Sequence, residues 1–140
     1  LVGEGARADS LGLVIAGKGQ TQDTGAKSVH LAPHTTSTIF SKSISKDGGI
    51  ANYRGLIKIS KKAKNSRASL VCDSLLLDSY SQANAFPAVE NANDQVEISH
   101  EARIGRIGDE EIFYLKSRGF SESEAVRLAV NGYATLIIKK

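Results

Sequence analysis

Residues 55–77 decide the fold class, because three short apolar runs follow one another within them: G-L-I-K-I (55–59), A-S-L-V (68–71) and L-L-L (75–77). Runs of this length are typical of β-strands, and the Ser, Lys, Asn and Asp residues between them end strands and form turns. No helical spacing of apolar residues extends across any run. The stretch therefore predicts a succession of short strands.

The same pattern extends outward from Leu11 to Ile98, with further runs at 11–15, 28–31, 37–40 and 96–98. Ser and Thr are frequent inside the runs, which suits strands. Asp47-Gly48-Gly49 is the clearest tight turn, and no Asn-Gly hairpin signal occurs in this region. Two architectures fit this pattern, a sandwich of antiparallel strands and a β-solenoid of stacked coils. Because no fixed repeat period is visible, the pattern alone leaves both open.

The C-terminal tail changes character at Gly108 and predicts two short amphipathic helices. Asp109 can cap the first helix, which carries acidic residues in its first turn, as the helix dipole favours. Gly119 supplies a stop. Ser121 and Glu124 then form an S-x-x-E capping box for a second helix, predicted to end at Asn131-Gly132.

Composition indicates one globular domain, since 140 residues with 41% hydrophobic and 24% charged content can form an ordinary core. A net charge of +3 with few aromatic residues argues against a nucleic-acid groove. No apolar run is long enough to cross a bilayer. The one cysteine forms no intramolecular disulfide, so we expect a reducing compartment, the cytoplasm. A start at Leu1 and the absence of methionine suggest a fragment of a longer protein.

The side chains best suited to bind a metal ion are those of Cys72, His100 and Glu101. A thiolate, an imidazole and a carboxylate can together bind iron. Taken alone, a single cysteine is more often a small buried hydrophobe. Strand alternation also places His100 and Glu101 on opposite faces, so they share one site only if the strand ends or turns between them.

Other candidates have structural interpretations. His30 and His34 lack metal-ligand spacing and are expected to be structural or turn residues. Arg54 is expected to be a turn residue or to stack on neighbouring coils, rather than to hold a substrate. The two Gly-x-Gly segments, 3–5 and 17–19, lack the ending of a phosphate loop. The lysines at 58, 61, 62 and 64 indicate a solvated edge.

Several short motifs, in this order, resemble the SufB/SufD scaffold family of the SUF iron–sulfur cluster assembly machinery. Each motif is weak by itself, but their order is strong evidence of homology. They are D-T-G-A-K-S-V-H-L (23–31), Y-R-G-L (53–56), C-D-S-L-L (72–76), F-P (86–87), H-E-A (100–102), I-G-D-E-E-I-F-Y (107–114) with R-G (118–119), and N-G-Y (131–133).

The resemblance implies a mainly β fold: a right-handed parallel β-helix over residues 1–107, followed by a small helical subdomain over 108–140 that is truncated here. It also implies a scaffold without turnover of its own. The iron–sulfur cluster is transient in the full complex and not expected in the isolated fragment. The implied candidates for iron or sulfur handling are Cys72, His100 and Glu101. The His-Glu pair resembles SufB more than SufD, whereas residues 96–99 look more like SufD.

The implied partners are a SufC-type ABC ATPase and a SufB- or SufD-like paralogue, or a second copy, joined through the β-helix. Phe113, Tyr114 and Arg118 are the candidates for binding the ATPase, since aromatic and arginine side chains commonly anchor interfaces. Neither nucleic acid nor a membrane span is implied. Two alternatives remain, a β-helix enzyme acting on polysaccharide and a purely structural β-solenoid. The first would need a carboxylate cluster and sugar-stacking aromatics, and the acidic residues here are scattered.

Overall fold

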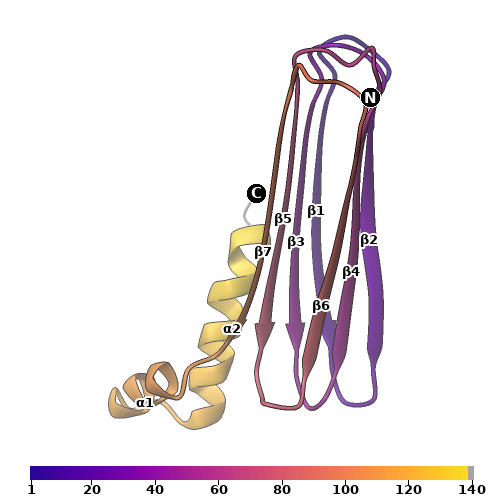
Figure 1. Cartoon of the computed structure of the whole chain (residues 1–140). Coiled ribbons are helices and arrows are strands. Elements are labelled where there is room, and N and C mark those ends of the chain that lie inside the picture. Colours follow the sequence, from indigo (N-terminus) through magenta and orange to yellow (C-terminus); the bar gives the residue numbers. More distant parts are fainter. Residues whose placement is uncertain (139–140) are drawn as a thin grey trace.

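The computed structural model describes residues 1–138, and within them seven strands are followed by two helices (Figure 1). The strands are β1 (Arg7–Ala16), β2 (Thr21–His30), β3 (Thr36–Ser45), β4 (Ile50–Ile59), β5 (Ser66–Leu76), β6 (Gln82–Asn91) and β7 (Val96–Arg106). The helices are α1 (Asp109–Ser117) and α2 (Glu122–Ile138).

The strands form two parallel sheets that the chain visits in turn. Odd-numbered strands make one sheet in the order β1-β3-β5-β7, and even-numbered strands make the other in the order β2-β4-β6. Each coil therefore adds one strand to each sheet, and every strand pairs in parallel with the equivalent strand of the next coil. This is a β-solenoid, which confirms the predicted parallel β-helix and excludes the antiparallel sandwich.

Coil length explains why no fixed repeat is visible in the sequence. Register partners on successive coils are 29 residues apart for Asp23 and Asn52 but 32 residues apart for Lys58 and Glu90. The corresponding spacing is 30 residues for Arg67 and Glu97. The variation lies in the turns, because the pairing inside the strands stays in register. A solenoid with variable turns leaves no constant period in its sequence.

The core lies between the two sheets and follows strand alternation. Ile39, Ile57, Ile59 and Leu70 are among its buried members. Its polar end is built around His30, which is 0% exposed and contacts Thr35 and Ser37 through its two ring nitrogens at 2.7 and 2.8 Å. His30 is thus a hydrogen-bonded core residue, which agrees with a structural role and not with a turn.

The outer faces of the sheets carry stacked side chains. Arg54 is paired with Asp23 at 3.2 Å and lies 4.8 Å from the centre of the Phe86 ring. These residues come from β4, β2 and β6, so Arg54 links three successive coils. This agrees with the stacking role expected for Arg54.

The helices begin close to the predicted positions. Gly108 rather than Asp109 is the N-cap of α1, and the Gly108 amide donates to the Glu111 carboxylate at 3.1 Å. Gly119 ends the turn after α1 with a φ of +95°, a conformation that glycine adopts without strain. The predicted capping box is confirmed, since the Ser121 amide donates to Glu124 at 2.8 Å and the Glu124 amide donates to the Ser121 hydroxyl at 3.4 Å.

The predicted end of the second helix at Asn131-Gly132 is wrong, because α2 continues to Ile138. Glycine inside a helix costs about 1 kcal/mol relative to alanine. Packing offsets this cost here, since Ala134 is buried and the carbonyl of Tyr133 accepts a 3.0 Å hydrogen bond from Lys42. Tertiary contacts thus stabilise α2 across Asn131 and Gly132, where its helix propensity is low.

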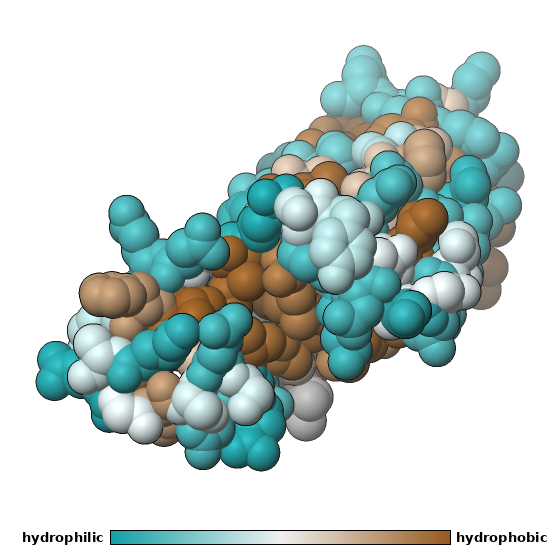
Figure 2. All heavy atoms as spheres, turned by 90° about the horizontal axis from the view of Figure 1, so that it is seen from below, coloured by the Kyte–Doolittle hydropathy of each residue, from teal (hydrophilic) through white to brown (hydrophobic). Residues whose placement is uncertain are grey.

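Helix α2 packs against the outer face of the four-stranded sheet, at β1 and β3. Apolar side chains gather between the helical segment and the strands when the molecule is seen from below (Figure 2). Helix α1 contacts α2 and has no buried residue of its own. The division into a β-helix over 1–107 and a separate folding unit over 108–140 stays a prediction, and residues 139 and 140 lie outside the described part.

Candidate functional site

Cys72 lies in the interior of the β-solenoid. It points inward from β5, is 3% exposed and belongs to the main apolar cluster. Its direct neighbours in the register are Ser41 on β3 and Ala102 on β7. Burial, and then the charge of Asp73, raise the pKa of the Cys72 thiol to about 11. In this conformation Cys72 is a neutral thiol near pH 7.

His100 lies on the same inward face, one strand further along. It pairs with Leu70, while Ala102 pairs with Cys72, so His100 is the diagonal neighbour of Cys72 across the β5–β7 pair. Unlike Cys72, His100 is exposed, because β7 is the last strand of its sheet in this chain. The thiol and the imidazole are therefore neighbours on one face with very different access to solvent.

Glu101 lies on the opposite face of β7, because the strand continues through Arg106 without turning. It pairs in the register with Val71, and its carboxylate accepts a 2.8 Å hydrogen bond from Nε of Arg103. The structure thus brings Cys72 and His100 onto one face and places Glu101 on the other. Within residues 1–138, no group of three or more His, Cys, Asp or Glu side chains is arranged to hold a metal ion.

Tyr53 is a site residue that the sequence analysis did not single out. It points inward from β4, is 9% exposed, and belongs to the same apolar cluster as Cys72. Burial, and then the charge of Cys72, raise the pKa of the Tyr53 hydroxyl to about 12. The alternation Ala51, Tyr53, Gly55, Ile57 could have placed it inside, but only the fold shows which residue it faces.

Lys42 is the second residue that was missed. It points outward from β3 beneath α2 and is 2% exposed. Its ammonium lies 3.9 Å from the centre of the Tyr133 ring. Lys42 lies on the face of β3 opposite the inward-pointing Ser41, where a lysine would be exposed to solvent if no helix covered the sheet.

The candidate partner-binding side chains lie on α1 and just after it. Phe113 is 72% exposed and Tyr114 56% exposed. The guanidinium carbon of Arg118 lies 5.2 Å from the centre of the Tyr114 ring. These three side chains form an exposed aromatic and cationic surface around the turn at Gly119.

No helix within residues 1–138 is long and apolar enough to cross a membrane. Residues 1–133 match the family described as SUF system FeS cluster assembly, SufBD core domain. Two curated relatives are iron–sulfur cluster assembly SufBD family proteins, one from Staphylococcus aureus (strain USA300) and one from Staphylococcus saprophyticus subsp. saprophyticus. Each is 49% identical over 133 residues, which cover 95% of this chain and 29% of the relative. The chain therefore belongs to the SufBD family of iron–sulfur cluster assembly proteins.

Proposed function

We propose that this chain supplies part of a cluster-building site in a SufB-like scaffold subunit, with iron and sulfur as cargo. The observation that carries the proposal is the shared inward face of Cys72 and His100, a thiol and an imidazole on paired strands. Thiolates are the usual ligands of iron–sulfur clusters, and histidine replaces them in some centres. Such a protein acts by holding cargo and partners and has no turnover of its own, and we place it in the cytoplasm.

The burial of Cys72 implies that the site works in two states. At 3% exposure and with a raised pKa, the thiol neither reacts readily nor binds iron while the solenoid is closed. Movement of β7 would uncover Cys72 and let an arriving cation favour the thiolate. Burial would then protect the sulfur from oxidation between rounds of assembly.

Glu101 remains a candidate ligand at the free edge of β7. A cargo held inside the lumen would reach His100 but not Glu101. A cargo held at the edge of the sheet would reach both of these side chains. The two positions are distinguished by substituting each residue separately.

The same edge is where we expect a second subunit to bind. The β7 strand pairs with β5 on one side and has no strand partner on its other side within residues 1–138. Unpaired strand edges readily pair with another chain. We propose a SufB- or SufD-like paralogue, or a second copy of this protein, as the occupant, which would place His100 and Glu101 next to the interface.

The helical segment is the proposed dock for a SufC-type ATPase. Support comes from the exposure of Phe113 and Tyr114 and from the stacking of Arg118 on Tyr114, since aromatic and arginine side chains dominate interface energetics. Helix α1 has no buried residue, so its surface is free to bind a partner.

The test is anaerobic cluster assembly in the complete subunit with its partners, followed by visible absorption. We expect Cys72→Ala to fold normally and to abolish cluster formation, and His100→Ala to reduce it. Glu97→Gln is the matched control for Glu101→Gln, because both glutamates point outward from β7 and pair with an arginine. A normal cluster yield from folded Cys72→Ala would refute the proposal, whereas a loss of stability would identify Cys72 as a packing residue.

A further inference from the structure

Asp73 lies between two cations and, within residues 1–138, forms an ion pair with neither of them. Its register neighbours are Lys42 on β3 and Arg103 on β7, and all three side chains lie on the outer face of the four-stranded sheet. Lys42 donates a 3.0 Å hydrogen bond to the Tyr133 carbonyl, and Arg103 is paired with Glu101 at 2.6 Å. Oδ1 of Asp73 is therefore left buried without a hydrogen-bond partner among the described residues.

An uncovered sheet would not keep the charges of Lys42 and Asp73 apart. Neighbouring strands lie about 4.8 Å apart, so two opposite charges at paired positions are within reach of an ion pair. Buried polar atoms also normally have a hydrogen-bond partner. Helix α2 separates the two residues, because its Tyr133 carbonyl and ring hold the Lys42 ammonium.

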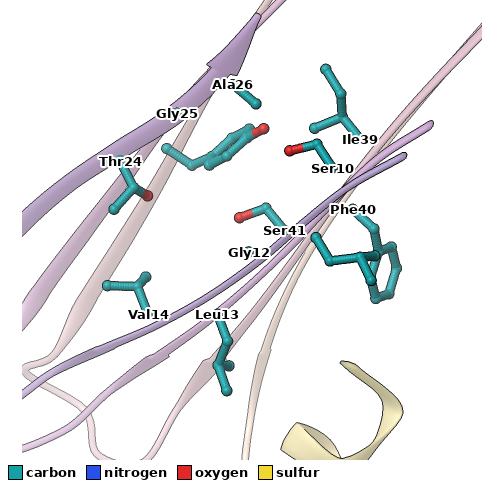
Figure 3. Close-up of a pocket in the computed structure, with 12 residues that line it drawn as sticks. Ser10, Gly12, Leu13, Val14, Thr24, Gly25, Ala26, Ile39, Phe40 and Ser41 are labelled. Atoms are coloured by element: carbon teal, nitrogen blue, oxygen red, sulfur yellow. The ribbon is translucent and has the colours of Figure 1, made fainter. Parts of the chain in front are cut away.

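Figure 3 shows which face of the sheet is involved. In this view of the cavity in the first coil, Ser41 points toward the interior, whereas Leu13 and Phe40 point to the opposite side, where α2 lies. Leu13 pairs with Lys42 in the register, and the centre of the Phe40 ring is 5.8 Å from the Lys42 ammonium. Lys42 therefore projects from β3 into the space between the sheet and α2.

The contact between α2 and the sheet contains a second buried oxygen without a partner. Oη of Tyr133 is buried and has no hydrogen-bond partner within residues 1–138. Burial, and then the charge of Asp73, raise the pKa of this hydroxyl, so it lies within electrostatic reach of the Asp73 carboxylate. Each of these oxygens loses its water when α2 packs on the sheet, and neither gains a hydrogen bond in return. The contact is therefore weaker than one in which every polar group is satisfied.

We propose that α2 is a detachable helix and that Lys42 has two partners, the Tyr133 carbonyl when α2 is docked on the sheet and the Asp73 carboxylate when α2 is released. Release then satisfies Oδ1 of Asp73, which the docked state leaves unpaired, and returns the Tyr133 hydroxyl to water. A partner that binds the inner surface of α2 therefore displaces it more easily than it would displace a fully satisfied helix. The proposal concerns the attachment of α2 and does not depend on the binding of iron or sulfur.

The docked state remains the main state, because release uncovers apolar surface. Ile44, on the same face of β3 as Lys42, is 1% exposed, and Ala134 on α2 is 9% exposed. Exposing such surface to water is unfavourable. The released state is thus a minor population, and a measurement has to trap it.

A water-soluble carbodiimide traps the released state, because it joins an ammonium and a carboxylate that are in direct contact into an amide. The complete subunit is treated near neutral pH, and the cross-linked peptides are quantified by mass spectrometry over time. Lys58 and Glu90, an exposed ion pair at 2.6 Å, are the internal reference. In the parent protein the Lys42–Asp73 product should accumulate much more slowly than the product of the reference pair.

Two substitutions at Tyr133 form a matched pair. Both Tyr133→Leu and Tyr133→Phe remove the unpartnered hydroxyl, but only Tyr133→Phe keeps a ring over the Lys42 ammonium. Losing a desolvated cation–π contact should raise the released population about thirtyfold, so Tyr133→Leu should form the Lys42–Asp73 product about thirtyfold faster. Hydrogen exchange in α2 should quicken by a similar factor. Tyr133→Phe should increase neither rate, and the reference pair should react equally in all three proteins.

Faster exchange in α2 of Tyr133→Leu without more Lys42–Asp73 product would overturn the proposal, because Lys42 would then move into solvent. Unchanged exchange in that variant would also overturn it, because the ring would then not hold α2. If Tyr133→Leu does not fold, the parent protein decides. Local openings occur within seconds, so absence of the Lys42–Asp73 product after overnight reaction would overturn the proposal. Formation as fast as that of the reference pair would do the same, since the ion pair would then exist in the docked state.

Discussion

Lys42 and Tyr133 join the β-solenoid to the helical segment through two contacts at once. The Lys42 ammonium donates a 3.0 Å hydrogen bond to the Tyr133 carbonyl and lies 3.9 Å from the centre of the Tyr133 ring. Lys42 pairs in the register with Asp73, the residue after Cys72, and Oδ1 of Asp73 is buried without a hydrogen-bond partner within residues 1–138. Helix α2, which contacts the α1 helix of the proposed ATPase dock, therefore rests partly on β3, the strand next to the one that carries Cys72.

We expect Lys42→Ala to weaken the attachment of α2. A desolvated cation–π contact is worth about 2 kcal/mol, and a hydrogen bond from a charged donor about 1.5–3 kcal/mol. The change should lower the apparent free energy of unfolding by about 2–4 kcal/mol and speed hydrogen exchange in α2 more than in β5. Lys62→Ala is the control, since Lys62 is exposed. Equal exchange rates in α2 of the variant and the parent protein would show that Lys42 does not hold the helix.

Cys72 should react as a buried, protonated thiol. With a pKa of about 11, its alkylation rate should keep rising about tenfold per pH unit beyond pH 9, where an ordinary cysteine approaches a plateau. The measurement is the initial rate of iodoacetamide labelling between pH 7 and 10. A plateau below pH 9 would mean that the closed solenoid stabilises the thiolate already.

Strand alternation and turn residues predicted the β-rich character, and the order of family motifs predicted the parallel β-helix. The opposite orientations of His100 and Glu101 also followed from alternation, because a strand fixes which neighbours share a face. Tyr53 could not be matched with Cys72 in this way. Their meeting depends on turn lengths that vary between coils, and the sequence does not encode those lengths as a period.

The burial of residues on the outer faces of the sheets could not be predicted from the sequence either. Lys42 lies on a strand whose alternation points it outward, yet it is 2% exposed because α2 covers it. The cover arises from a helix that continues past Asn131 and Gly132, and local propensity argued for an end there. Local sequence patterns therefore predicted most strands and helices. Packing between elements far apart in the sequence decided where α2 ends and whether Lys42 is buried.

His30 should make the protein less stable in mild acid. Burial, and then the N-terminal charge, lower the pKa of His30 below its ordinary value of 6.5. Between the lowered pKa and 6.5 the unfolded chain binds more protons than the folded one, so stability falls as the pH drops through 6.5. Denaturation midpoints at pH 7.5 and 5.5 measure this loss. His34→Gln should keep the pH dependence, and its persistence in His30→Gln would assign it to another group.

Asp78 organises the turn between β5 and β6 and ties it to the preceding coil. Its carboxylate accepts hydrogen bonds from the amide of Ser81 at 2.7 Å, the hydroxyl of Ser81 at 2.8 Å and the amide of Asp47 at 2.6 Å. We expect Asp78→Ala to cost about 2 kcal/mol of unfolding free energy, because several donors lose their partner together. Urea denaturation measures the loss, and Asp94→Ala in the exposed loop is the control. A difference below 0.5 kcal/mol between the two variants, roughly the effect of an ordinary surface change, would contradict this role.

Acid should remove the contribution of Asp78. Burial acts to raise its pKa, but the hydrogen bonds from Ser81, Asp47 and Tyr80 lower it overall from 3.8. The folded state therefore holds the charged carboxylate more strongly than the unfolded state does, and this stabilisation is lost as the pH falls below 3.8. The difference in stability between the parent protein and Asp78→Ala should be constant above pH 5 and shrink towards pH 3. A difference that does not change with pH would mean that the charge of Asp78 is not involved.

The exposed side chains of α1 should carry the binding of the partner ATPase. Tyr114 and Arg118 stack on each other outside the core, so replacing both with alanine removes an interface anchor with little loss of folded-state packing. We expect a loss of about 2–4 kcal/mol in binding free energy by calorimetric titration, the size typical of hot-spot residues, with an unchanged melting temperature. Tyr80→Ala is the matched control, because Tyr80 is similarly exposed but lies in the turn between β5 and β6 and not in the helical segment. Unchanged affinity in the double variant would place the dock on another surface, whereas a lowered melting temperature would show that Tyr114 and Arg118 stabilise the helices themselves.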